Sequence, residues 1–161
     1  MNSKWYTRDD AFYDVAEGIR LTVEEIVVQD VAKQYVDEGY QFYTQRQYPE
    51  AITAYEQALQ HDPKCFKAYN NKGCVLSDLK RYEEALAAFE QAAQIKPNKA
   101  EAIKNMGYAL IYLKRYKEAI DVLNLVLKID SHDENVRNDL SALYDTVNGS
   151  SEAQQVYTKT I

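Results

Sequence analysis

Apolar and small residues recur along this chain at one regular interval. Gly39, Gly73 and Gly107 are equally spaced. The same interval separates four alanines and two prolines, at Ala51, Ala85, Ala119 and Ala153, and at Pro63 and Pro97. A period of about 34 residues predicts stacked helical hairpins, with one hairpin in each repeat.

The position of the glycine defines the frame of the repeat. With the glycine as eighth residue, the units are 32–65, 66–99, 100–133 and an incomplete 134–161. Ser141 replaces the glycine in the fourth unit. The fourth, eighth and eleventh residues of a unit share one stripe of a first helix, and the twentieth, twenty-fourth and twenty-seventh share one stripe of a second. We expect these stripes to face each other, because Gly39 and Ala51 let the two axes approach to roughly 8–10 Å.

Large residues fill the remaining template positions. The fourth residue of a unit is Tyr35, Tyr69 or Ile103. The eleventh is Phe42, Leu76, Leu110 or Tyr144, and the twenty-fourth is Tyr55, Phe89, Leu123 or Tyr157. In this pattern the chain resembles the tetratricopeptide repeat family over about four fifths of its length. The resemblance implies an all-α fold, an α-α superhelix of stacked hairpins whose first helices line a concave face.

Residues 1–31 precede the array as an acidic, aromatic segment. They hold three basic and seven acidic side chains, and their rings are Trp5, Tyr6, Phe12 and Tyr13. The pattern predicts a short helix near 9–18 and a second helix that starts at Thr22 and runs into the first unit. We expect this segment to cap the first unit. The alternative is that it occupies the groove as a built-in ligand.

Composition and charge narrow the function. The chain has 161 residues with only 5 Gly and 3 Pro, which favours helices. Its formal charge of -6 gives no electrostatic reason to expect a nucleic acid or an anionic membrane as partner. The sequence contains no apolar run of about 18 residues and no readable secretory signal, and Cys65 and Cys74 are its only cysteines. We therefore expect a cytoplasmic protein with reduced thiols.

No catalytic, metal or cofactor site is predicted. His61 and His132 are the only histidines, and neither has a second ligand at metal-binding spacing on its helix face. Cys74 has no histidine close in sequence to act as a base, and the glycines do not form a phosphate-binding loop. We expect a protein that is not an enzyme and that binds no cofactor.

The tyrosines indicate where binding occurs. Eight of the 14 occupy template positions and two lie in the N-terminal segment, which leaves Tyr40, Tyr43, Tyr108 and Tyr112. The resemblance places these four rings on the concave face of the first helices. The predicted peptide-binding groove comprises Lys33, Val36, Tyr40, Tyr43, Lys67, Asn70, Cys74, Ser77, Lys104, Tyr108, Ile111 and Tyr112. The alternative for any one ring is packing between layers or under residues 1–31.

These residues predict a non-catalytic adaptor that binds a peptide segment of another protein. The peptide would carry two apolar anchors five to seven residues apart, because two layers span roughly 20 Å and an extended residue about 3.3 Å. Asn70 and Lys104 would hold its backbone, and Lys67 and Lys104 would recognise its charge.

Two subtypes of the family offer more specific roles. Carboxylate-clamp arrays hold a C-terminal carboxylate at positions occupied here by Val36, Tyr40, Asn71, Glu101 and Asn105. Only Asn71 fits, so a clamp is not expected. Chaperones of type III secretion translocators are similarly short and acidic and carry N-terminal helices, so this role is an alternative. Self-assembly through the incomplete fourth unit and the aromatic N-terminus, giving a homo-oligomer, is another.

Overall fold

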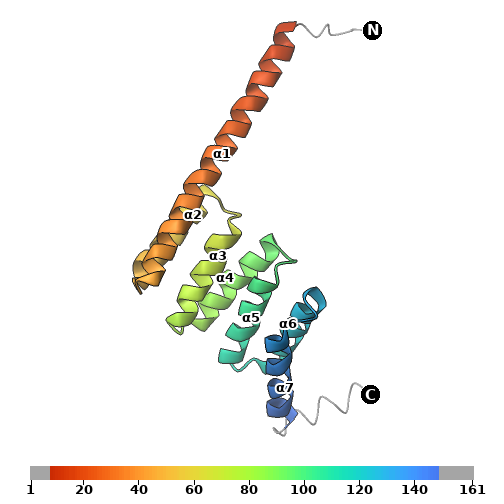
Figure 1. Cartoon of the computed structure of the whole chain (residues 1–161). Coiled ribbons are helices and arrows are strands. Elements are labelled where there is room, and N and C mark those ends of the chain that lie inside the picture. Colours follow the sequence, from red (N-terminus) through yellow and green to blue (C-terminus); the bar gives the residue numbers. More distant parts are fainter. Residues whose placement is uncertain (1–7, 149–161) are drawn as a thin grey trace, which may run out of the picture.

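The computed structural model describes residues 8–148, and all the regular structure in that range is helical (Figure 1). The helices are α1 (Arg8–Thr44), α2 (Tyr48–His61), α3 (Phe66–Asp78), α4 (Tyr82–Ile95), α5 (Ala100–Tyr112), α6 (Tyr116–Ile129) and α7 (Glu134–Asn148). The predicted all-α class is confirmed.

Successive helices form a single stack. The pairs α1–α2, α3–α4 and α5–α6 are hairpins, and α2 contacts α3, α4 contacts α5 and α6 contacts α7. The first helices also touch one another, α1 with α3 and α3 with α5. The structure is therefore the predicted superhelix, with the first helices of successive hairpins as neighbours.

Close approach of the two helices of a hairpin depends on the repeated glycine. A Cβ atom built on Gly73 would lie 2.5 Å from Cε1 of Phe89, and one on Gly39 would lie 2.6 Å from Cε1 of Tyr55. In the third hairpin the equivalent distance, from Gly107 to Cδ2 of Leu123, is 2.6 Å. These distances leave no room for a methyl group, so the predicted role of the glycine is confirmed.

The turns within the hairpins share one geometry. Arg46, Lys80 and Lys114, which occupy the same position in successive units, have φ of 60°, a left-handed conformation. In the first turn the amide of Gln47 donates to the Phe42 carbonyl at 2.9 Å, and Arg46 donates to the carbonyl of Tyr43 at 2.9 Å. These two bonds form a Schellman motif, which satisfies the last carbonyls of the first helix. A basic residue therefore occupies the position where glycine is usual.

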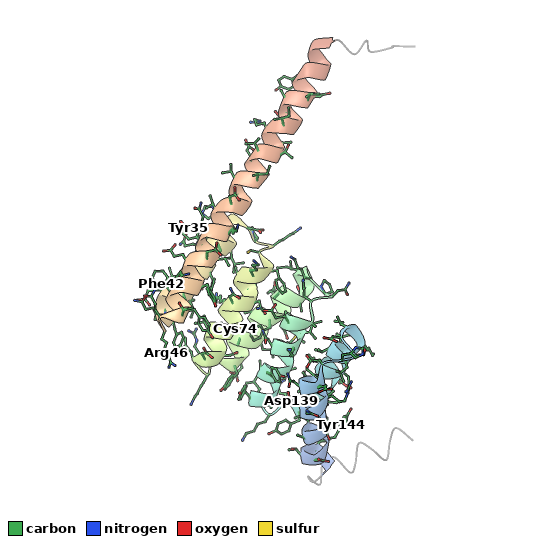
Figure 2. All side chains as sticks on the ribbon, in the orientation of Figure 1. Tyr35, Phe42, Arg46, Cys74, Asp139 and Tyr144 are labelled. Carbon is green, nitrogen blue, oxygen red and sulfur yellow. The ribbon has the colours of Figure 1, made fainter. Side chains whose placement is uncertain are left out.

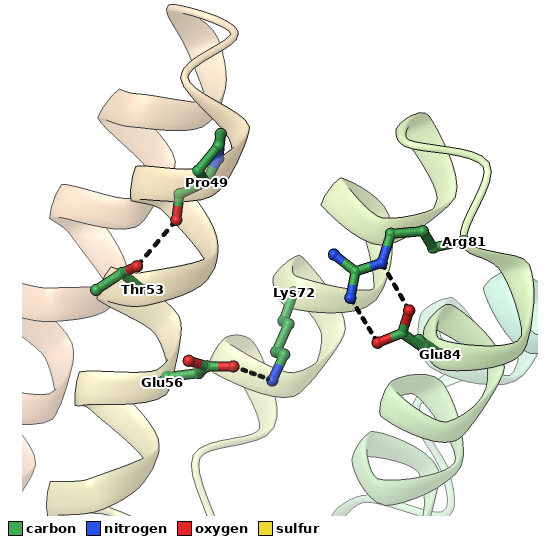
Figure 3. A network of polar contacts seen from close by, with 6 residues as sticks. All are labelled: Pro49, Thr53, Glu56, Lys72, Arg81 and Glu84. Carbon is green, nitrogen blue, oxygen red and sulfur yellow. Dashed lines mark hydrogen bonds and ion pairs between the residues drawn. The ribbon is translucent and has the colours of Figure 1, made fainter.

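Polar contacts support the stack on its surface. Nζ of Lys72 on α3 lies 2.7 Å from Oε1 of Glu56 on α2 and links the first two hairpins (Figure 3). At the start of α4, Nη2 of Arg81 lies 2.6 Å from Oε2 of Glu84, and the Arg81 Nε donates to Oε1 at 2.6 Å. Each such exposed pair contributes only about 0–1 kcal/mol, so packing dominates the stability.

The N-terminal segment differs from its prediction. Instead of a short helix near 9–18 followed by a helix starting at Thr22, α1 is one helix of 37 residues. The Thr22 hydroxyl donates to the carbonyl of Gly18 at 2.5 Å, so it bonds back into the preceding turn and does not cap a new helix. The first half of α1 projects beyond the hairpins (Figure 1). Ala32 is the first buried residue of the described part of the helix. In this structure the described part of the segment neither covers the first unit nor enters the groove.

The fourth unit contributes α7. Val136, Leu140 and Leu143 are buried against the core of the preceding hairpin. Asp133 caps the helix, because its Oδ1 accepts the amide of Val136 at 3.1 Å. The predicted second helix of this unit, 151–161, lies outside the described residues.

Candidate functional site

The candidate site lies on the first helices of the units. A hollow of about 420 Å³, called here the central hollow, receives residues from α1, α3, α4, α5 and α7. Its lining is Tyr43, Cys74, Ser77, Asp78, Phe89, Asn105, Tyr108, Ala109, Tyr112 and Asp139. Figure 2 labels two of them, Cys74 on α3 and Asp139 on α7. The structure therefore brings five of the twelve predicted groove residues together: Tyr43, Cys74, Ser77, Tyr108 and Tyr112.

A second hollow of about 390 Å³ lies between α1, α3 and the start of α5. It is called here the lysine-rimmed hollow, and its lining is Val36, Asp37, Tyr40, Phe66, Lys67, Asn70, Asn71, Lys96, Lys99 and Glu101. Four predicted groove residues belong to it: Val36, Tyr40, Lys67 and Asn70.

A third hollow, of about 450 Å³, lies between α5 and α7. Tyrosine, isoleucine and leucine side chains give it apolar walls, and its lining is Tyr108, Ile111, Tyr112, Tyr116, Asp139, Ala142, Leu143 and Thr146. It shares Tyr108, Tyr112 and Asp139 with the central hollow. The two hollows are therefore adjacent parts of one groove.

Two of the four predicted tyrosines are held between layers. The Tyr43 hydroxyl donates to Oδ2 of Asp78 at 2.9 Å, and that of Tyr108 donates to Oδ2 of Asp139 at 2.9 Å. In both cases burial, and then the hydrogen bond to the carboxylate, raises the pKa of the phenol to about 12. The alternative of packing between layers applies to these two rings, which are half-buried.

The other two rings are more exposed. Tyr40 is 53% exposed at the lysine-rimmed hollow. Tyr112 is 61% exposed, and its ring stacks on that of Tyr82 with centroids 4.6 Å apart and an interplanar angle of 7°. Tyr40 and Tyr112 are therefore the rings best placed to contact a ligand.

Two residues that were predicted to hold a peptide backbone have other partners. Asn70 is 2% exposed; its Nδ2 donates to Glu101 at 2.8 Å, and its Oδ1 accepts from Asn105 at 3.1 Å. Nζ of Lys104 lies 3.0 Å from Oδ2 of Asp133. In this structure both side chains join neighbouring units, so contact of either with a peptide backbone remains a prediction.

Val36 lies mainly in the core, beside the lysine-rimmed hollow. It is 4% exposed and packs in the core of the first hairpin with Ala51 and Tyr55, so it reaches the lysine-rimmed hollow only at its edge. Lys33 is exposed on α1 but lines none of the three hollows.

Two lysines of the lysine-rimmed hollow were not predicted from the sequence. Lys96 and Lys99 come from the turn between α4 and α5 and join Lys67 there. Within residues 8–148 none of the three forms an ion pair, although Nζ of Lys96 lies 5.5 Å from the centroid of the Phe66 ring. The two lysines in Lys96-Pro97-Asn98-Lys99 are the feature of the sequence that could have indicated this basic site. The turn between α4 and α5 brings them next to the first helices.

Chemically reactive groups are sparse in the described part of the chain. Burial, and then the charges of Glu101 and Asp78, raises the pKa of the Cys74 thiol to about 11. The ring of His61 stacks on Tyr35 at 5.5 Å between centroids. Among residues 8–148 no group of three or more His, Cys, Asp or Glu side chains is arranged to hold a metal ion. None of the helices in that range, α1 included, combines the length and the apolar character that crossing a membrane requires.

Comparison with protein families settles the type of repeat. Two models described as tetratricopeptide repeat match the chain, one over residues 36–100 and the other over residues 76–143. The chain belongs to the tetratricopeptide repeat family. Arrays of this family are protein-interaction modules, and the stacked hairpins described above have their architecture.

Solved structures of the same fold extend over most of the chain. The first TPR of Spaghetti (RPAP3), bound to HSP90 peptide SRMEEVD, has a TM-score of 0.72 and 21% identity, and the match covers 74% of this chain and 95% of that one. The Arabidopsis OM64 TPR domain has a TM-score of 0.68 and 20% identity, covering 72% and 96%. The TPR2B domain of yeast Sti1 in its pHsp70 complex has a TM-score of 0.63 and 25% identity, covering 78% and 97%. A search of curated proteins found no significant match.

Proposed function

We propose that this chain is a non-catalytic adaptor that binds a peptide segment of another protein along its first helices. The observation that carries the proposal is the row of hollows that joins α1, α3, α5 and α7, with exposed rings at both ends. Tyr40 and Tyr112 belong to units two steps apart, roughly 20 Å at about 10 Å per layer. An extended peptide of about six residues spans that length.

Charge indicates which peptides fit the end at Tyr40. The chain as a whole is acidic, with a formal charge of -6, yet three lysines without carboxylate partners in the described range surround the lysine-rimmed hollow. We therefore propose an acidic residue in the segment that binds beside Lys67, Lys96 and Lys99. The peptide complexes of Spaghetti and Sti1 support peptide binding by this fold, and SRMEEVD is itself acidic.

A free C-terminal carboxylate is not part of the proposal. Val36 and Tyr40 stand where carboxylate-clamp arrays place Lys and Asn, and Glu101 adds a negative charge that accepts the hydrogen bond from Asn70. The proposed ligand is instead an internal segment with an acidic side chain near one anchor and an apolar side chain at Tyr112.

A displayed library of random heptapeptides, selected on the full chain, provides the probe. The best peptide is then titrated by fluorescence anisotropy into Tyr40→Ala and Tyr112→Ala. We expect each change to weaken binding about five- to tenfold, as for an exposed aromatic anchor. Tyr13→Ala is the matched control, because Tyr13 is exposed on α1 and lines none of the three hollows.

The charge of the ligand is tested separately. Lys67→Glu with Lys99→Glu is compared with Lys117→Glu on α6, which lines none of the hollows. We expect only the first pair to weaken binding of an acidic peptide. If the Tyr40 and Tyr112 variants both bind every selected peptide as tightly as the wild type, the proposed groove is wrong.

A further inference from the structure

The N-terminal arm of α1, residues 8–31, presents apolar side chains to solvent. Its exposed large residues are Tyr13, Val15, Ile19, Leu21, Val23, Ile26, Val27 and Val28. No described helix packs on this arm, and Figure 1 shows it extending away from the hairpins. So many exposed apolar side chains on one helix are typical of an interaction surface.

Four of these residues form one stripe. Val15, Ile19, Val23 and Ile26 follow each other at intervals of four, four and three residues, which places them within an arc of about 80° on a helix of 3.6 residues per turn. The side that packs on the array, marked by Ala32 and Val36, is centred about 120° away. The array therefore leaves this stripe, called here the arm stripe, accessible.

Charge is distributed so that the arm stripe stays neutral. Asp14, Glu17 and Glu24 lie on the opposite side of the helix, and Arg20 pairs with Glu17 and Glu24 there. Asp30 is the single acid of the described arm in register with the stripe, at its C-terminal end. A basic partner helix would have few carboxylates to pair with beside the arm stripe. The same neutral stripe on a second copy of the chain is complementary to it.

The composition of the arm is a second reason to expect that a partner packs on its stripe. Valine, isoleucine, threonine and glycine have weak helix propensity, and they supply Val15, Gly18, Ile19, Thr22, Val23, Ile26, Val27 and Val28. Helices without a packed face are marginal in water, even when they are built from good helix formers. The arm is therefore expected to persist as a helix mainly when its stripe is buried.

We propose that the arm stripe pairs with the same stripe of a second copy of this chain, in antiparallel orientation. A two-fold axis near Leu21 places Ile19 against the partner's Val23 and Val15 close to the partner's Ile26. A parallel pair would bring two Asp30 carboxylates side by side, whereas the antiparallel pair separates them by about 27 Å, the length of 18 residues. The acidic sides face solvent in both copies.

The size of the contact sets the expected strength. Paired over residues 12–30, two helices overlap along about 27 Å with a width of about 10 Å each. The interface is then about 540 Å² for both copies together, which is below the size of stable complexes. We therefore expect a weak dimer that dissociates well above micromolar concentrations, and the peptide groove on the first helices is not consumed by it.

Sedimentation velocity of the full chain, from micromolar to millimolar concentrations, tests the pairing. The mass of the wild type is expected to rise from 18.6 kDa toward twice that value. Val23→Glu should weaken the dimer at least tenfold, because each copy brings a charge to the interface. Leu21→Glu is the matched control: both residues are 52% exposed, but they lie about 160° apart around the helix. It should leave dimerisation unchanged within about twofold.

Spin labels test the orientation. In a Cys65→Ser, Cys74→Ser background that dimerises like the wild type, a label at Asp30→Cys should report an interchain distance of about 27 Å. A distance of about 10 Å would show a parallel pair and overturn the proposed orientation. The proposal itself is wrong if the wild type remains a monomer at every concentration, or if Leu21→Glu weakens the dimer as much as Val23→Glu.

Discussion

Replacing Gly73 by alanine tests the packing rule that the repeat imposes. A Cβ atom at Gly73 would lie 2.5 Å from Cε1, 2.7 Å from Cδ1 and 2.8 Å from Cζ of Phe89. The Phe89 ring is 2% exposed and belongs to the main hydrophobic core, so it has little room to move. The two helices must therefore separate, or the ring must leave its rotamer.

The magnitude follows from two opposing effects. Overpacking a core by one methyl group costs about 1–3 kcal/mol, and three contacts to a rigid ring place this site in the upper part of that range. Alanine gains about 1 kcal/mol over glycine in helix propensity. The expected net loss in the free energy of unfolding for Gly73→Ala is about 1–2 kcal/mol. This corresponds to a melting temperature lower by about 3–8 °C for a chain of this size.

Gly18→Ala is the matched control, because a Cβ atom there has nothing within 4 Å. This variant gains helix propensity without a clash, so its array should melt at or slightly above the wild-type temperature. Gly107→Ala should cost less than Gly73→Ala, because its contacts are to Cδ2 and Cγ of Leu123, a side chain that can change rotamer. Urea and thermal melts followed by circular dichroism measure all three variants. A Gly73→Ala chain as stable as the wild type would refute the reasoning.

Four further predictions address single side chains. The buried Tyr55 hydroxyl has no hydrogen-bond partner in the described structure, since Asn71 lies near it without completing a bond. Tyr55→Phe removes this unpaired hydroxyl, so it should raise the free energy of unfolding by about 1 kcal/mol in a urea melt. The hydrogen bond from the Val136 amide, and then the one from Lys104, lower the pKa of Asp133. The stability that this carboxylate contributes is therefore present above its unfolded pKa, about 3.9, and is lost on acidification through the folded pKa. Asp133→Ala should cost about 1 kcal/mol at neutral pH, and the urea midpoint of this variant should depend less on acid than that of the wild type. The pKa of Tyr43 and of Tyr108 is raised to about 12, so above about pH 10 the unfolded chain loses these protons while the folded chain keeps them. The free energy of unfolding should therefore fall between about pH 10 and 12. The fall should be less steep in a Tyr43→Phe, Tyr108→Phe chain. The Cys74 thiol, with its pKa raised to about 11, should react with iodoacetamide at pH 8 more slowly than free cysteine does, as measured by peptide mass spectrometry; an equal rate would contradict the burial of this thiol.

Much of the fold was predictable because its signals are local. The eighth and twenty-fourth residues of a unit are only 16 positions apart, and one short turn brings them together, so Gly73 and Phe89 identify the hairpin contact. The start of a helix at Thr22 was predicted wrongly, because a threonine side chain can either cap a helix or bond back to the preceding turn, and here it bonds to Gly18.

The candidate site was predictable only in part. Tyr40 and Tyr112 are exposed as the spare-tyrosine argument predicts, but Tyr43 and Tyr108 donate to carboxylates of the following unit. Lys96 was missed because it lies in a turn, outside the helical pattern from which the groove was inferred. The position of a residue in the repeat predicts the helix that carries it. It does not predict the hydrogen-bond partner of a long side chain, because several acceptors come within reach once the units stack.

From Ala32 onward, the sequence by itself determined the helices of the repeats, their pairing into hairpins and the side of each helix that is buried, because these depend on spacing within a few turns. The tertiary structure decided which polar groups are consumed between units. Asn70 meets Glu101 and Lys104 meets Asp133 across 31 and 29 residues, and only the superhelical stacking of one unit on the next sets those distances. It also decided that the N-terminal arm stands clear of the array, since an apolar stripe specifies that a helix needs a partner but not where that partner lies.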